Sequence, residues 1–453
     1  MSNLILNSDS YKYSMHVQYP PETEYVYSYI ESRGGNYDKM VFFGLQMFVE
    51  EYLMKPIKQR DIDEAEEVIL PHIGVFNRKG WEYILEKHKG YLPVEIRAVT
   101  EGIKLPISNA LVTIVNTDPE CFWLTTFLET ALLRAIWYPT TIATQGYHTK
   151  QFLKKAILCS GGSVEGLPFM LHDFGCRGVS SHESSAIGGV AHLVNFAGTD
   201  NIPALVQAKK YYRCETAGYS VPAMEHSTVT SWGNECELAS YMNMVEKYKD
   251  KPIISCVSDS YNIFDACHMV GISLSQTIID NHITYVIRPD SGDPSTVLIK
   301  CLGILQQYFP THVNEAGYKV LENVKLLWGD GINHDSIKEI ATTVLVAGYS
   351  LENIVFGSGG ALLQQMNRDT MKFAMKCSAI QVNGEWRDVY KDPITDTGKR
   401  SKRGLVKLYH NGTDYVTATE KPDGYDDALN LVYQDGWMCR RQSLDEIREL
   451  VNS

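Results

Sequence analysis

Hydrophobic and polar residues follow one pattern near the two ends of the chain and another in its middle. Near the start they alternate, as in residues 25–29 and 94–98, which predicts β-strands with one buried face. Near the end, Asn-Gly or Asp-Gly pairs that predict hairpins lie between apolar runs at 383–384, 411–412 and 435–436. We therefore expect antiparallel sheet at both ends, with a short final helix capped by Ser443 and Glu446.

The middle of the chain, from about residue 165 to 365, repeats a short apolar run, a Gly- or Asp-rich turn and a helical stretch. The apolar runs lie at residues 169–171, 253–257, 285–287, 324–327 and 354–356, with weaker members before 198–200 and 225–228. Strands that alternate with helices predict a parallel sheet, either doubly wound or closed as a barrel. Because loops after parallel strands converge on one face, we expect the polar residues there to share one site.

Composition narrows the class of protein. At 453 residues, with 44% hydrophobic and 21% charged residues, the chain is long enough for two globular domains. A net charge of −12 argues against a nucleic-acid partner, which requires a basic face. We expect no membrane span, because no apolar run approaches ~18 residues, and no secretory leader, because the start lacks a basic and then apolar segment.

The ten cysteines are scattered, with no Cys-x-x-Cys pair. In a chain of this size they are expected to be reduced thiols in a cytoplasm. Their spacing predicts neither a zinc nor an iron–sulfur site.

Two glycine-rich turns follow the last two predicted strands, at Gly329-Asp330-Gly331 and at residues 357–360. Glycine lets backbone N–H groups approach a phosphate closely, and the last loops of a barrel are a frequent phosphate site. Either turn alone could equally be a tight strand–helix connection, but their joint placement favours phosphate binding.

Charged residues also follow the predicted strands. Arg288 and Asp290, on either side of Pro289, could bind phosphate and sugar hydroxyls or form a local salt bridge. Carboxylates at predicted strand ends, a set that would suit Mg²⁺ near a phosphate, are Asp200, Asp259, Asp290 and Asp330.

Phe174 and His226 lie in loops between predicted strands and helices. Phe174 could stack on a flat ligand ring or anchor its loop, and the nearby Arg177 could pair with a phosphate. His226, next to Glu225, could be a base, a metal ligand or a nucleophile. A lone histidine is more often a structural group, and the residues alone favour that interpretation.

Taken together, strings spread over nearly the whole chain resemble the nicotinamide phosphoribosyltransferase family. They include Asp-Ser-Tyr-Lys at 9–12, Asn-Thr-Asp-Pro-Glu-Cys at 116–121, His-Asp-Phe-Gly at 172–175, Gly-Tyr-Ser-Val-Pro at 218–222, Glu-His-Ser-Thr at 225–228, Ser-Asp-Ser-Tyr at 258–261 and Arg-Pro-Asp-Ser-Gly at 288–292. So many ordered matches are far more specific than any single motif.

The resemblance implies an α/β fold with two domains. An atypical α/β barrel would span residues 160–368, and a second α+β domain of antiparallel sheet would be built from both chain ends, residues 1–159 and 369–453. It also implies a homodimer with shared active sites that converts nicotinamide and phosphoribosyl pyrophosphate to nicotinamide mononucleotide and pyrophosphate. Mg²⁺ would be the cofactor and ATP a coupling co-substrate.

By matching position, the resemblance implies roles for particular residues. The catalytic set would be His226, Asp290 and Arg288, with His226 phosphorylated by ATP. Nicotinamide would contact Phe174, Asp200, Arg288 and, from the partner subunit, Tyr11. The phosphoribosyl group would contact Arg177, Gly329, Asp330, Gly359, Gly360 and Asp290. The pyrophosphate and ATP side would be lined by Arg33, Arg368, Lys376, Lys391, Glu225 and Asp259. Mg²⁺ would lie near Asp259, Asp290 and Glu225.

Two positions depart from the family's pattern, and two alternative functions have to be weighed against the one that the resemblance implies. The family often has an aromatic residue where this chain has Cys176 and a serine where it has Ala374, and the loss of that hydroxyl would weaken phosphate contacts. The alternatives are a nicotinate phosphoribosyltransferase and a non-catalytic ligand-binding protein on the same scaffold. Asp200 favours the amide because a carboxylate repels nicotinate, and His226 argues against a mere binder.

Overall fold

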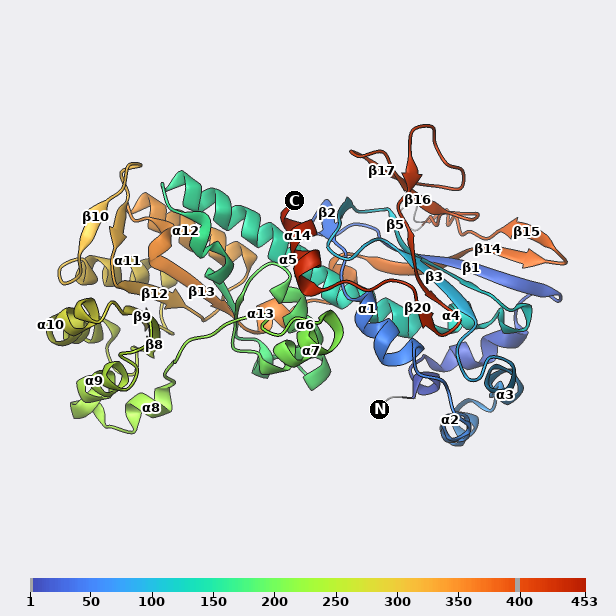
Figure 1. The fold of residues 1–453 in the computed structure, drawn as a ribbon, viewed down its shortest axis with the longest axis horizontal. Coiled ribbons are helices and arrows are strands. Elements are labelled where there is room, and N and C mark those ends of the chain that lie inside the picture. Colours follow the sequence, from blue (N-terminus) through green and yellow to red (C-terminus); the bar gives the residue numbers. More distant parts are fainter. Residues whose placement is uncertain (1–2, 396–399) are drawn as a thin grey trace. The chain divides into compact units, whose positions relative to one another are not determined.

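A six-stranded parallel sheet and a seven-stranded antiparallel sheet belong to different parts of the computed structural model, which describes residues 3–395 and 400–453 (Figure 1). The antiparallel unit comprises Met1–Thr144, Lys210–Arg213 and Met366–Ser453, and the barrel unit comprises Gln145–Lys209 and Cys214–Gln365. The long helix α5 (Glu129–Cys159) begins in the first unit and ends in the second. Among the described residues, none of the helices is both long enough and apolar enough to cross a bilayer.

Six parallel strands form the sheet of the barrel unit, in the order β7-β6-β13-β12-β9-β8. They are β6 (Leu171–Asp173), β7 (Gly198–Thr199), β8 (Ile253–Val257), β9 (Thr284–Arg288), β12 (Val324–Trp328) and β13 (Ile354–Ser358). Most of the predicted apolar runs coincide with these strands. The run at 169–171 is displaced, because a 3-10 helix that contains Pro168 occupies Val164–Phe169 and delays the strand to Leu171.

An irregular segment joins the two edges of this sheet. On one side, Thr199 N donates to Tyr219 O at 3.0 Å, and on the other, Met224 N donates to Ser255 O at 2.9 Å. Each side makes one isolated parallel bridge, and Pro222 between them has no N–H to extend the pairing. The ring of parallel segments is thus completed, which confirms the predicted atypical α/β barrel.

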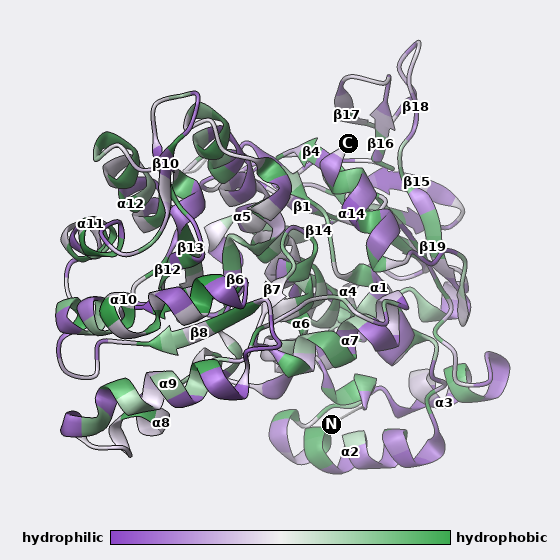
Figure 2. Ribbon diagram, turned by 60° about the vertical axis from the view of Figure 1, so that its left-hand side comes forward, coloured by the Kyte–Doolittle hydropathy of each residue, from purple (hydrophilic) through white to green (hydrophobic). Residues whose placement is uncertain are grey.

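Helices follow the strands of the barrel as the alternating pattern predicted. They are α6 (His182–Leu193), α7 (Ile202–Tyr212), α8 (His226–Thr230), α9 (Glu237–Lys247), α10 (Ile263–Asp280), α11 (Pro294–Leu305), α12 (His334–Val346) and α13 (Gly360–Leu363). A hairpin of β10 (Thr311–Val313) and β11 (Lys319–Leu321) is inserted before β12. Figure 2 shows hydrophobic residues along most of β8, which packs into one core with α9, α10, α11 and α12.

The antiparallel unit is built from both chain ends, as predicted. Its seven-stranded sheet has the order β15-β14-β1-β5-β3-β19-β20. The strands are β1 (Thr23–Ser32), β3 (Val94–Ala98), β5 (Ala110–Asn116), β14 (Phe373–Val382), β15 (Glu385–Asp388), β19 (Asn430–Gln434) and β20 (Trp437–Met438). Helices α2 (Gln59–Ile73) and α3 (Arg78–Lys87) pack their apolar faces into the core of this sheet.

Smaller sheets complete the antiparallel unit. They are formed by β2 (Lys39–Val41) with β4 (Lys104–Pro106), and by β16 (Lys407–His410) with β17 (Tyr415–Ala418) and β18 (Asp426–Asp427). Short helices α1 (Leu45–Phe48) and α4 (Leu124–Phe127) precede α2 and α5.

The predicted hairpins and the final helix are confirmed, although the hairpin at Asn411-Gly412 has a longer loop, residues 411–414, between β16 and β17. Asn383 and Gly384 have φ of 51° and 78°, and Asp435 and Gly436 have φ of 49° and 94°, the left-handed pair that a two-residue hairpin turn requires. In helix α14 (Leu444–Asn452), Ser443 Oγ accepts from Glu446 N and the Glu446 carboxylate accepts from Ser443 N.

Candidate active site

The loop after β6 is held by a buried carboxylate that the sequence did not single out. Asp173 accepts hydrogen bonds from Gly175 N at 2.7 Å and from Asn201 Nδ2 at 2.9 Å. Burial raises the pKa of Asp173 to about 6, against the effect of these hydrogen bonds. Phe174 N donates to Ser358 O at 2.9 Å, so the position of Phe174 is fixed by two strand ends.

The ring of Phe174 lies against glycines of the two predicted turns. A Cβ on Gly357 would lie 2.1 Å from Phe174 Cε2, so only glycine fits there. The Cβ position of Gly329 is 3.7 Å from Phe174 Cδ2 and 3.6 Å from Asp290 Oδ1. Phe174, Gly329 and Asp290 therefore meet at one place, although they follow three different strands.

The turn after β13 lies beside the loop at 175–178. The Cβ position of Gly175 is 2.9 Å from Gly359 O, and that of Gly178 is 3.2 Å from Gly360 N. Arg177 lies between these two glycines and is exposed. An exposed guanidinium next to a glycine turn at a strand end is suited to a phosphate.

His226 begins α8 and is held by Asp259. The imidazole Nε2 lies 3.0 Å from Asp259 Oδ1, and Ser291 Oγ donates to Asp259 Oδ2 at 2.6 Å. Burial opposes the ionisation of Asp259, but the hydrogen bonds from Ser291 and His226 outweigh it and lower its pKa. Glu225 accepts instead from the hydroxyl of Ser227. An ionised carboxylate therefore orients the exposed imidazole.

Asp290 and Arg288 carry charges that the protein alone does not fully compensate. Burial raises the pKa of Asp290, and the charges of Asp259 and Asp330 raise it further, while Arg288 and His226 oppose this. Arg288 Nε is buried and has no hydrogen-bond partner within the described residues. A bound oxygen acceptor would satisfy this donor.

Asp200 lies at the end of β7 beside the same loop. Its N–H donates to Asp173 O at 3.0 Å, and Ser220 Oγ donates to Asp200 Oδ1 at 2.5 Å. Burial lowers the pKa of the neighbouring His172 to about 4, with the charge of Asp200 opposing. Sequence reasoning missed Ser220 as a partner of Asp200, although it stands in the Gly-Tyr-Ser-Val-Pro string.

Other predicted residues belong to the antiparallel unit, where Arg33 and Glu31 form a half-buried ion pair. Arg33 Nε lies 2.8 Å from Glu31 Oε1, and Lys402 contacts the same carboxylate. Tyr29 accepts from Lys402 N at 2.9 Å. Sequence reasoning missed Glu31. It named Lys402 only as part of a basic run and did not predict its contact with Glu31, which depends on the tertiary fold.

A surplus of positive charge surrounds Lys376. Burial lowers its pKa, the charges of Arg33, Lys391 and Arg368 act in the same direction, and Glu129 opposes them. Binding of an anion would relieve this repulsion. Tyr11 is also in this unit and is 56% exposed.

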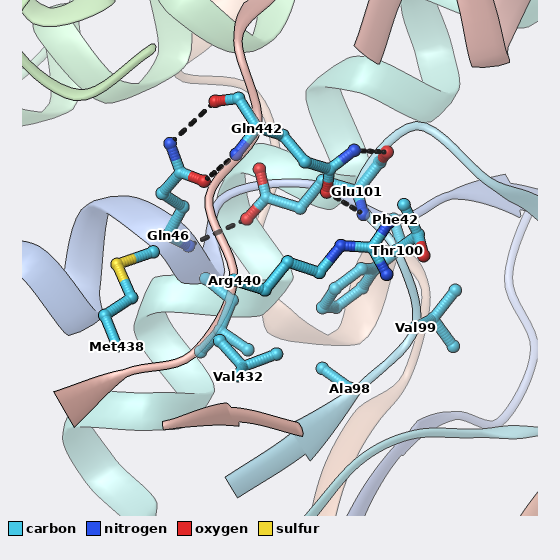
Figure 3. A pocket seen from close by; sticks show the side chains of 11 residues that line it. Phe42, Gln46, Ala98, Val99, Thr100, Glu101, Val432, Met438, Arg440 and Gln442 are labelled. Carbon is cyan, nitrogen blue, oxygen red and sulfur yellow. Dashed lines mark hydrogen bonds between the residues drawn. The ribbon is translucent and has the colours of Figure 1, made fainter. Parts of the chain in front are cut away.

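A separate hollow in the antiparallel unit (Figure 3) is lined by Phe42, Arg440 and a polar network. Buried Glu101 accepts from Gln46 N at 2.7 Å and from Tyr212 Oη at 2.8 Å. Gln442 N donates to Gln46 Oε1 at 2.8 Å, and Gln46 Nε2 donates to Gln442 O at 2.9 Å. Because these groups satisfy one another, we assign the network a structural role.

Comparisons with known proteins agree on one family. The model of the nicotinate phosphoribosyltransferase (NAPRTase) family matches residues 169–435, and that of the nicotinamide phosphoribosyltransferase N-terminal domain matches residues 3–96. A nicotinamide phosphoribosyltransferase of Xanthomonas campestris is 48% identical over 99% of this chain and 98% of its own length. Another nicotinamide phosphoribosyltransferase, from Acinetobacter baylyi, is 32% identical over 97% of this chain and 95% of its own length.

Solved structures share the fold. The nicotinate-nucleotide pyrophosphorylase from Pyrococcus furiosus has a TM-score of 0.63 at 17% identity, covering 99% of this chain and 95% of its own. Human nicotinic acid phosphoribosyltransferase has a TM-score of 0.59 at 15% identity, and the match covers 98% of this chain and 92% of the human one.

Proposed function

Because the chain belongs to the nicotinamide phosphoribosyltransferase family, we propose that it makes nicotinamide mononucleotide and pyrophosphate from nicotinamide and phosphoribosyl pyrophosphate. The observation that carries this proposal beyond the family is the meeting of Phe174, Gly329 and Asp290 at the strand ends. An aromatic face, a glycine turn and a carboxylate there offer one place for a flat ring, a phosphate and a sugar.

Phe174 and Asp200 bind the base. The Phe174 ring, fixed by Gly357, stacks on the pyridine ring. Asp200, whose Oδ1 is engaged by Ser220, accepts from the amide NH₂ of nicotinamide with its remaining lone pairs. A carboxylate at this position repels the carboxylate of nicotinate, so we expect the amide to be preferred.

Arg288, Asp290 and the glycine turns bind the phosphoribosyl group. Asp290 accepts from ribose hydroxyls. Arg288 Nε, which has no hydrogen-bond partner among the residues that the structure describes, donates to a ligand oxygen, and Arg177 holds the phosphate together with the turns at Gly329–Asp330 and Gly359–Gly360. The pyridine nitrogen forms a bond to C1 of the ribose as the bond from C1 to pyrophosphate breaks. Positive groups fixed before the reaction stabilise the departing pyrophosphate, and we assign this role to Arg33, Arg368, Lys376 and Lys391.

The donor set near Asp290 fits Mg²⁺. Burial raises the pKa of Asp290, and the charges of Asp259 and Asp330 raise it further. A hard divalent cation that takes carboxylate oxygens as ligands would remove this repulsion. Asp259 and Asp290 would hold the ion, with Glu225 beside them. When bound, the ion would supply positive charge to the pyrophosphate oxygens.

His226 couples the reaction to ATP. Asp259 accepts from Nε2, which leaves the lone pair on Nδ1, on an exposed side chain at the start of α8. Nδ1 attacks the terminal phosphorus of ATP, a nitrogen–phosphorus bond forms, and ADP leaves.

We place the enzyme in the cytoplasm, because its ten cysteines are free thiols. We also propose a homodimer, and the exposed ring of Tyr11 supports this because it is available to a partner subunit.

The test is turnover with nicotinamide and with nicotinate, each with and without ATP, in the wild type and in His226→Ala. We expect a strong preference for nicotinamide and ATP stimulation that is lost in the variant. Asp200→Ser should shift the preference toward nicotinate. Higher turnover of nicotinate by the wild type would favour a nicotinate phosphoribosyltransferase, and no turnover of either base would favour a non-catalytic binder.

A further inference from the structure

We propose that His88, Asp118 and Cys121, in the antiparallel unit, form a binding site for a divalent cation of the zinc class. One ligand atom from each residue can be chosen so that all three lie within 4.8 Å of one another. This site is separate from the barrel residues assigned to nicotinamide and phosphate, and it does not depend on the proposed reaction.

Two regular elements hold the three residues. His88 caps the C-terminal end of α3, Asp118 caps the 3-10 helix Pro119–Cys121, and Cys121 is the last residue of that helix. Asp118 Oδ1 accepts from Glu120 N at 2.9 Å, and Asp118 Oδ2 lies 2.7 Å from His88 Nε2 and accepts from Tyr83 Oη at 3.1 Å. The orientation of the carboxylate is therefore set before a cation binds.

The donor types select the metal. Sulfur and imidazole nitrogen beside a carboxylate suit Zn²⁺, whereas Mg²⁺ takes oxygen ligands and does not suit sulfur. Zinc lies ~2.0–2.3 Å from such ligands. A tetrahedral ion would hold its ligand atoms farther apart than the 2.7 Å between His88 Nε2 and Asp118 Oδ2, so these two groups must separate when the ion enters between them. Binding replaces the S–H bond of Cys121 by a sulfur–metal bond, and the thiol proton passes to solvent. The His88 nitrogen that binds the metal must be unprotonated, so the imidazole proton stays on the other ring nitrogen.

Access comes from one side. Cys121 is completely buried, whereas the side chains of His88 and Asp118 are 25% and 18% exposed. A cation entering there keeps a fourth position for water, which completes a tetrahedron. The spacing of cysteines alone predicted no zinc site, because two of the three ligands are not cysteines and His88 lies on a different element.

Cobalt reports directly on the sulfur ligand. The full-length protein, freed of metal with a chelator, is titrated with Co²⁺ and followed by its absorbance. We expect one equivalent to give the visible bands of a tetrahedral ion together with a sulfur-to-cobalt charge-transfer band in the near ultraviolet. Zn²⁺ should abolish both, and excess Mg²⁺ should change neither.

Variants decide the assignment. Cys121→Ser should lose the charge-transfer band, and His88→Ala should weaken Zn²⁺ affinity at least as much as the about 10- to 100-fold known for loss of an outer partner. Cys159→Ser removes an exposed cysteine outside the site and should change nothing. His88 is only partly buried, so His88→Ala tests the site even if Cys121→Ser does not fold. Absence of a stoichiometric spectrum in the wild type would overturn the proposal, as would a spectrum and affinity unchanged in His88→Ala.

Discussion

Two positions near Phe174 are occupied by glycine, and the absence of a side chain there leaves space in the candidate site. Gly357 leaves room for the Phe174 ring, and Gly329 leaves the space between that ring and Asp290 open. The sequence attributed both turns to phosphate binding. In the structure, Gly357 instead gives the Phe174 ring its position, because any β-carbon there would overlap the ring.

Gly357→Ala should therefore impair catalysis without unfolding the protein. The added methyl lies 2.1 Å from Phe174 Cε2 and must push the ring aside, and a displacement of about 1 Å in a positioning group can cost about 100-fold in rate. We expect a raised KM for nicotinamide and reduced kcat/KM in steady-state assays. Gly303→Ala, where a Cβ meets no atom within 4 Å, is the control and should leave both constants unchanged.

Asp173 should give the stability of the protein a pH dependence of its own. Its pKa is about 6 in the folded state and 3.8 when free, so between these values the folded state retains a proton that the unfolded state loses. Stability therefore falls as pH rises from about 4 to about 6 and then levels off, with a magnitude of up to about 3 kcal/mol.

Urea unfolding of the wild type and of Asp173→Asn across this range isolates the effect. The difference between their free energies of unfolding should change with pH below 6 and be constant above it. A difference that is independent of pH from 4 to 7 would show that Asp173 is already ionised in the folded protein at pH 4.

Among the elements, the two ends of helix α7 belong to different units. Its N-terminal end follows Asp200 and Asn201, whereas its C-terminal Tyr212 belongs to the antiparallel unit. There the buried hydroxyl of Tyr212 donates to Glu101, and its ring stacks on Phe43 at 5.1 Å between centroids. If the Tyr212 hydroxyl is removed, water cannot take over its hydrogen bond, because the Glu101 carboxylate is buried.

Tyr212→Phe should destabilise the protein by about 1.5–3 kcal/mol, the range for a hydrogen bond to a charged group. A shift of the unfolding midpoint in urea measures this. Tyr248→Phe, which alters a tyrosine that is 39% exposed, is the matched control. Equal midpoints for the two variants would mean that the hydroxyl of Tyr212 contributes little beyond the packing of its ring.

Elements with a regular pattern could be predicted from the sequence, whereas irregular ones could not. The strand at 94–98 and the turn at Asp435-Gly436 follow from alternation and from turn chemistry, and both are present. The segment 219–224, which the sequence marked only as a weaker member of the alternating pattern, completes the barrel through isolated bridges and not through a regular strand. Contacts such as Gly357 with Phe174 depend on tertiary packing, so the sequence named residues of the site but not their neighbours.

At the scale of the whole molecule, the proposed homodimer has a consequence that a mixing experiment can measure. If Tyr11 completes the active site of the partner subunit, Tyr11→Ala and Phe174→Ala are each defective as pure dimers. In a mixed dimer, one site contains an intact Phe174 and an intact Tyr11, and the other contains neither. Random exchange yields half mixed dimers with one competent site each, so about a quarter of wild-type activity should return.

The two purified variants are mixed under conditions that allow subunit exchange, and turnover of nicotinamide is followed with time. Activity that rises above that of either variant alone requires Tyr11 and Phe174 to come from different chains. If both residues of a site come from the same chain, every subunit in the mixture carries one defect and activity does not return. A mixture of Phe174→Ala with Asp290→Asn is the control, because both changes affect the same barrel and the mixed dimer gains no intact site that contains both Phe174 and Asp290.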